Sequence, residues 1–182
     1  HKETFDILTN LGAIKLKKKE FKEAEEYFEQ SIKLNPSFSD NYIFLAKCLI
    51  AQEKFDQTTD ILKKGSEFSI PNDKVLKSFA RIALEIKEYD LAIALYSKVL
   101  KKFPRDYFAF NNLGASYEAI NQFDLAKKNY KKSIELNPNF VDGLCNYANL
   151  LLSEGDFLNA ETIFLKALKF TNSPLQIYMY LS

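Results

Sequence analysis

Three cationic side chains, Lys74, Lys77 and Arg81, lie three and four residues apart, which places them on one face if the segment is helical. Lysine and arginine only donate hydrogen bonds, so a face that carries three of them is suited to binding carboxylates. This spacing favours contact with an acidic side chain or with the C-terminus of another protein.

Four further candidate binding residues carry carboxamides: Asn111 and Asn112 are adjacent, and Asn146 and Asn149 follow three residues apart. A carboxamide offers both a donor and an acceptor, so it can hold the backbone of an extended peptide whatever the side chains of that peptide are. This composition indicates binding rather than catalysis.

The sequence lacks the histidine-based residue sets and the phosphate loops of common catalytic and metal sites, and most of its carboxylates fall on outward helix faces. The single histidine is His1, so no Ser–His, Cys–His or His–metal set can form, and no glycine-rich phosphate loop is present. Cys48 and Cys145 lie too far apart in the sequence for a short metal motif. We therefore expect no enzymatic activity, no metal and no cofactor.

Composition argues against two classes of partner. The net charge is +1, with 47% apolar and 27% charged residues, so nothing in the charge balance calls for nucleic acid or an anionic membrane. No apolar run approaches the roughly 18 residues of a transmembrane helix. Two cysteines without a disulfide pattern favour a reducing compartment, and hence a cytoplasmic location.

The elements that would position these side chains follow from a period of 34 residues. Aromatic residues recur at this spacing in two series, with Leu62 as the single exception, and small residues recur in a third series. The series are Phe21, Phe55, Tyr89, Phe123, Phe157; Phe28, Leu62, Tyr96, Tyr130, Phe164; and Gly12, Ala46, Ala80, Gly114, Ala148.

Each copy of this period predicts two helices. Apolar residues recur three and four apart over about 14 residues, a short polar break follows, and a second amphipathic stretch ends near a proline in most copies. Small residues let the paired helices approach closely, and aromatic residues fill the space toward the next pair. One pair cannot bury its own apolar stripe, so the copies must stack into a solenoid.

This pattern resembles the tetratricopeptide repeat (TPR) family, whose 34-residue helix–turn–helix unit carries Leu-Gly, Tyr, Ala, Phe and Pro at these offsets. The resemblance implies an all-α, right-handed superhelical solenoid forming a single domain. Its units are 5–38, 39–72, 73–106, 107–140 and 141–174, with residues 175–182 opening a further helix.

The unit 39–72 departs most from the family pattern, at Thr58, Leu62, Gly65 and Ile70. Glycine in a helix interior costs about 1 kcal/mol relative to alanine, so Gly65 is expected to weaken its helix. We expect this unit to be the loosest of the five.

In the resembled family, the first helices of the repeats line a concave groove that binds extended peptides or partner helices, and its second, fifth, sixth and ninth positions point inward. The resemblance therefore implies a non-catalytic scaffold or adaptor whose peptide-binding groove is lined by Asn10, Phe44, Lys74, Lys77, Arg81, Phe108, Asn111, Asn112, Asn146 and Asn149. The clamp by which some members hold chaperone tails is not reproduced, because Arg81, Asp142 and Asn146 depart from it.

Two alternatives stay open. Because the sequence begins with His1 rather than Met, we expect it to be excised from a longer protein, where it would recruit substrates for an enzyme or help to assemble a complex. The apolar residues 175–182 lack the polar cap of a terminal repeat, so the protein could also form a homo-oligomer through this terminal helix.

Overall fold

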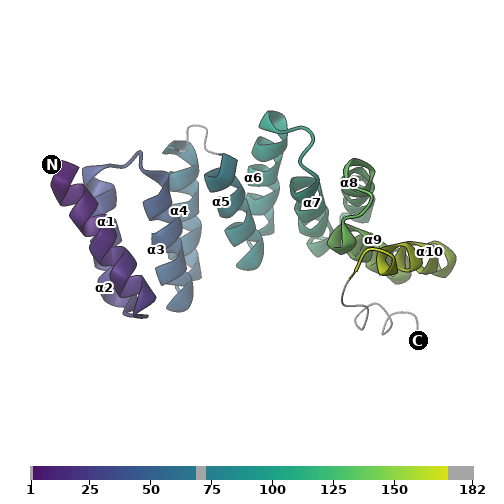
Figure 1. Ribbon diagram of the computed structural model, residues 1–182, viewed down its shortest axis with the longest axis horizontal. Coiled ribbons are helices and arrows are strands. Elements are labelled where there is room, and N and C mark those ends of the chain that lie inside the picture. Colours follow the sequence, from purple (N-terminus) through teal and green to yellow (C-terminus); the bar gives the residue numbers. More distant parts are fainter. Residues whose placement is uncertain (1, 69–72, 172–182) are drawn as a thin grey trace. The chain divides into compact units, whose positions relative to one another are not determined.

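The computed structural model describes residues 2–68 and 73–171, and within these ranges the protein forms ten α-helices and no strand (Figure 1). It divides into two compact units, residues 1–91 and 92–182. The helices are α1 (Lys2–Lys17), α2 (Phe21–Leu34), α3 (Ser39–Ala51), α4 (Phe55–Phe68), α5 (Asp73–Glu85), α6 (Tyr89–Lys102), α7 (Tyr107–Ala119), α8 (Phe123–Leu136), α9 (Val141–Ser153) and α10 (Phe157–Leu168).

The polar breaks of the sequence become tight turns between paired helices. One residue in each break has a left-handed backbone: φ is 62° at Lys19, 59° at Glu53, 65° at Lys87, 60° at Asn121 and 80° at Gly155. The next backbone N–H then bonds a carbonyl five residues back, as from Glu20 to Lys15 at 3.0 Å. This closes the end of the first helix and turns the backbone into the second.

Small and aromatic residues at matching steps bring the paired helices together. A Cβ atom built on Gly12 would lie 2.8 Å from Phe28, and one built on Gly114 would lie 2.7 Å from Tyr130. Both rings are buried. The absence of a side chain on each glycine therefore makes room for the facing ring.

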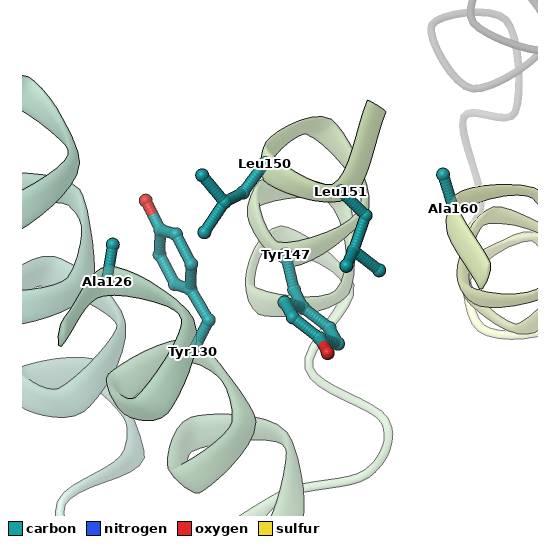
Figure 2. Close-up of a cluster of buried hydrophobic side chains, with 6 residues drawn as sticks. All are labelled: Ala126, Tyr130, Tyr147, Leu150, Leu151 and Ala160. Carbon is teal, nitrogen blue, oxygen red and sulfur yellow. The ribbon is translucent and has the colours of Figure 1, made fainter. Parts of the chain in front are cut away.

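In the second unit, the core between neighbouring pairs contains Tyr130, Tyr147, Leu150 and Leu151 (Figure 2). The figure shows Tyr130 on α8 pointing toward Leu150 on α9. Each pair thus buries apolar surface against the next, and the all-α helical-solenoid class expected from the period is confirmed.

In the repeat 39–72, residues that depart from the family pattern are packed into the core of the first compact unit, residues 1–91. Thr58 and Leu62 are fully buried, and the Thr58 hydroxyl donates to the carbonyl of Lys54 at 2.9 Å. Gly65 is buried against Tyr42 and Phe79. Ile70 lies outside the described residues, and the greater looseness of this unit stays a prediction.

Within residues 2–68 and 73–171, every helix is too short or too polar to cross a membrane.

Candidate functional site

In the first unit, the first helices of successive pairs are neighbours, because α3 contacts both α1 and α5. Asn10 on α1 is exposed, as are Lys74 and Arg81 on α5, whereas Lys77 is half-buried. The cations are therefore accessible to a ligand of this unit.

Phe44 is more closely tied to the core than an open groove position would be. Its ring stacks on Phe28 with centroids 5.4 Å apart and an interplanar angle of 29°. The ammonium of Lys47 lies 5.9 Å from the Phe44 ring centroid. Phe44 thus offers only part of its ring to a ligand.

In the second unit, the amide groups of the asparagines form a directed row of hydrogen bonds. Asn146 donates to Oδ1 of Asn111 at 3.0 Å, Asn111 donates to Oδ1 of Asn112 at 3.2 Å, and Asn112 donates to the Tyr96 hydroxyl at 2.9 Å. The row joins α9, α7 and α6. Each bond polarises the next, so the row acts as a fixed polar strip.

The members of this row differ in what they can offer a ligand. Asn111 is only 5% exposed and uses both its oxygen and its nitrogen within the row, so it positions its neighbours. Asn146 and Asn149 are half-buried, and among the described residues nothing hydrogen-bonds the Asn149 amide or the Asn146 oxygen. Those groups are the ones available to a peptide backbone.

Phe108 provides an aromatic surface one turn before Asn111. Its side chain is 51% exposed, and its ring stacks on Tyr107 at 4.4 Å and meets Phe140 edge-on at 4.8 Å. Because these contacts fix the ring, it can cover an apolar side chain of a ligand at little entropic cost.

Tyr96 is a member of the site that the sequence reasoning assigned only to packing. Its ring is buried, but its hydroxyl receives the last hydrogen bond of the amide row. The available signal was a tyrosine at a step where other repeats have Phe28 or Phe164, since a buried tyrosine hydroxyl usually has a hydrogen-bond partner.

Cys145 lies on the same helix as Asn146, half-buried against Leu144 and Ala148. Burial raises the pKa of its thiol, and the negative charge of Asp142 raises it further. We expect Cys145 to be alkylated more slowly than a free cysteine, with a rate that is still rising at pH values where a free thiol has reached its plateau.

Iodoacetamide labelling over a pH series, followed by mass spectrometry, measures this rate for each cysteine. Cys48 is the internal control: it is fully buried, burial raises its pKa to about 12, and it should react only in denaturant. An alkylation midpoint for Cys145 at or below that of N-acetylcysteine would contradict the expectation.

The described residues contain no group of three His, Cys, Asp or Glu side chains that could hold a metal ion. What they do contain is stacked helix pairs with accessible polar faces. These features define a helical repeat protein of the interaction-scaffold class.

The family follows from direct comparison. A family model described as tetratricopeptide repeat matches residues 5–38 and 107–140, and two further models of that description match 79–106 and 129–162. These ranges cover more than half of the sequence. The chain belongs to the tetratricopeptide repeat family.

Two similar proteins are much longer than this chain. The chain is 27% identical over 131 residues to the BBSome complex member BBS4 of Bos taurus, covering 72% of this chain and 25% of that protein. It is 24% identical over 160 residues to the Hsp70-Hsp90 organising protein of Plasmodium falciparum, covering 84% and 27%. The chain thus spans about a quarter of these two relatives.

Solved structures share the fold. MamA from Desulfovibrio magneticus RS-1 superposes with a TM-score of 0.76 at 17% identity, covering 93% of this chain and 98% of that one. YrrB, described as a TPR protein with an unusual peptide-binding site, gives 0.72 at 14% identity, covering 95% and 89%.

Proposed function

We propose that this protein binds extended segments of partner proteins through the faces formed by its first helices, and so serves as a recruiting or assembly region. The observation that carries this proposal is the amide row of the second unit. Among the described residues, it leaves the Asn146 oxygen and the Asn149 amide without an internal hydrogen-bond partner, in the same unit as the exposed, immobilised Phe108. This combination suits a peptide backbone with an apolar side chain.

In the first unit, the ligand would be acidic. Arg81 and Lys74 are exposed on α5, one turn to either side of Lys77. An arginine can hold a carboxylate through two parallel hydrogen bonds, and charge-assisted bonds of this kind are stronger than neutral ones. An acidic side chain or the C-terminal carboxylate of a partner protein is therefore the proposed ligand of this face.

The named relatives are compatible with a recruiting role. One is named as a member of the BBSome complex and the other as an organising protein of Hsp70 and Hsp90. Because this chain spans about a quarter of each, the proposed role is that of a segment within a longer protein. The residues invoked for self-association, 175–182, lie outside the described residues, so that alternative gains no support here.

Capture of partner proteins by four forms of the protein tests the proposal. Wild type is compared with Phe108→Ala/Asn149→Ala in the second unit and with Lys77→Glu/Arg81→Glu in the first. The control is Lys22→Glu/Lys63→Glu, which makes the same charge change at exposed positions on α2 and α4. Synthetic segments of each captured protein are then titrated by calorimetry.

We expect each of the two face variants to bind the partner segment recognised by that face about tenfold or more weakly than wild type does. One lost charge-assisted or well-packed contact is worth at least about 1.4 kcal/mol of binding free energy. The control should bind as wild type does. Segments that bind both face variants as tightly as wild type would place the interaction elsewhere and overturn the proposal. Matched melting curves exclude unfolding as the cause of any loss.

A further inference from the structure

The second unit carries a groove on the opposite face of α7 from the amide row. Successive helical residues are rotated by about 100°, so Phe110, Leu113 and Tyr117 lie opposite Phe108 and Asn112. These three side chains line a cavity of about 620 Å³. That volume lies within the range of about 300–1,000 Å³ typical of ligand pockets.

One wall of the groove is apolar and basic. It is formed by α8, from which Leu125 is 40% exposed and Lys128, Lys131 and Lys132 contribute positive charge. Of the described residues that line the cavity, Glu135 is the one acidic side chain, and it pairs with Lys132 at 3.1 Å. The net charge of the lining is therefore positive.

Among the residues that the structure describes, Lys128 and Lys131 of this lining form no ion pair. The Lys131 ammonium lies 5.9 Å from the Tyr147 ring centroid, and Lys128 is exposed and forms no ion pair within the part of the chain that the structure describes. A carboxylate from another molecule could approach both lysines without displacing an internal partner.

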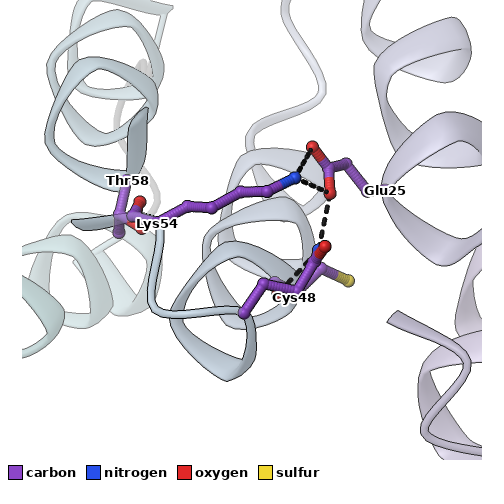
Figure 3. Close-up of polar contacts among 5 residues, drawn as sticks. Glu25, Cys48, Lys54 and Thr58 are labelled. Atoms are coloured by element: carbon purple, nitrogen blue, oxygen red, sulfur yellow. Dashed lines mark hydrogen bonds and ion pairs between the residues drawn. The ribbon is translucent and has the colours of Figure 1, made fainter. Parts of the chain in front are cut away.

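The first unit has a cavity at the same place in the fold, but its lining is different. A cavity at the corresponding repeat positions, lined by Leu45 and Leu49 of α3, has a volume of about 380 Å³. There, Lys54 of the lining contacts Glu25 of the lining at 2.8 Å (Figure 3), and Gln52 donates to the same carboxylate at 2.5 Å, so Lys54 of this cavity is already paired.

The linings of the two cavities differ at two corresponding positions of the repeat. Two 34-residue repeats earlier in the sequence, Gln57 corresponds to Leu125 and Asp60 corresponds to Lys128, and all four side chains are exposed. The second unit has thus replaced a polar and an acidic residue by an apolar and a basic one at a place where packing requires neither.

We propose that this groove binds an amphipathic helix of a partner protein, with apolar residues on one face and acidic residues along one flank. The apolar floor of the groove, formed by Phe110, Leu113 and Tyr117, extends over seven helical steps of α7, about 10 Å. This length matches two turns of a docked helix. Apolar residues at i, i+3 or i+4, and i+7 would contact the half-buried Phe110 and Tyr117 and the exposed Leu125, because Leu113 is already buried within the protein. Acidic residues on the flank would meet Lys128 and Lys131. A nucleic acid would use the lysines but leave the apolar floor uncovered.

The probe is a synthetic helical peptide of about four turns with leucine at those spacings, glutamate on one flank and one tryptophan. The full sequence of 182 residues has no tryptophan, so the fluorescence of the peptide reports binding without background. The variant is Leu125→Gln/Lys128→Asp, which places the residues of unit 39–72 at the same positions and is expected to fold.

We expect the variant to bind at least about tenfold more weakly than wild type, and added salt to weaken binding to wild type. A peptide with lysine in place of glutamate should show the reverse preference. Phe108→Ala/Asn149→Ala should bind the acidic peptide as wild type does, which separates this groove from the amide row. No binding at about 1 mM peptide, equal binding by the groove variant, or displacement of the peptide by single-stranded RNA would overturn the proposal.

Discussion

Replacing Tyr130 by alanine is expected to lower the free energy of unfolding of the second unit by about 3–5 kcal/mol. The ring is 1% exposed and fills the space left by Gly114, whose added Cβ would lie 2.7 Å from it. It also forms part of the core that joins α8 to α9 (Figure 2). Truncation therefore removes apolar contacts on two sides and leaves a cavity that the rigid helix pairs cannot close.

Tyr130→Phe separates this packing effect from the polar one. The hydroxyl donates to Oε2 of Glu118 at 2.6 Å, and phenylalanine occupies the same repeat step at Phe28 and Phe164. Loss of the Tyr130 hydroxyl should lower the free energy of unfolding by about 0.5–1.5 kcal/mol, the usual net value of a hydrogen bond. Urea unfolding followed by circular dichroism measures both variants, and similar costs for the two would show that packing is not the main contribution.

Much of this core could be predicted from the sequence, because the period of 34 aligns the residues that packing constrains. Phe28 and Tyr130 recur at one step, Gly12 and Gly114 at another, and the structure brings each glycine against its ring. A one-dimensional repeat makes such contacts local, so each is repeated in a predictable place.

The candidate site was harder to predict, because it depends on contacts that do not repeat. The residue types and the shared face of the asparagines followed from spacing, but the direction of the hydrogen bonds and the role of Tyr96 did not. Both depend on side-chain rotamers across successive helices. The apolar groove was missed for a related reason: Leu125 and Lys128 matter only in comparison with Gln57 and Asp60, and each alone resembles ordinary surface.

For Gly65, helix propensity and the contacts in the structure predict opposite effects of an alanine substitution on stability. Helix propensity alone predicts that Gly65→Ala stabilises the protein by about 1 kcal/mol. In the structure, a Cβ atom on Gly65 would lie 2.7 Å from Cζ of Phe79 and 2.9 Å from Cβ of Tyr42. The latter atom is attached directly to the backbone of α3, and both rings are buried, so neither neighbour can move away cheaply.

We therefore expect Gly65→Ala to destabilise the first unit by a net value of about 1–3 kcal/mol, since overpacking a buried contact outweighs the gain in propensity. Lys64→Ala is the matched control: it changes the preceding residue of α4, whose side chain is exposed. Urea unfolding of both variants decides between the two mechanisms. Stabilisation by Gly65→Ala would mean that propensity dominates, and that the contacts of Tyr42 and Phe79 do not constrain this helix.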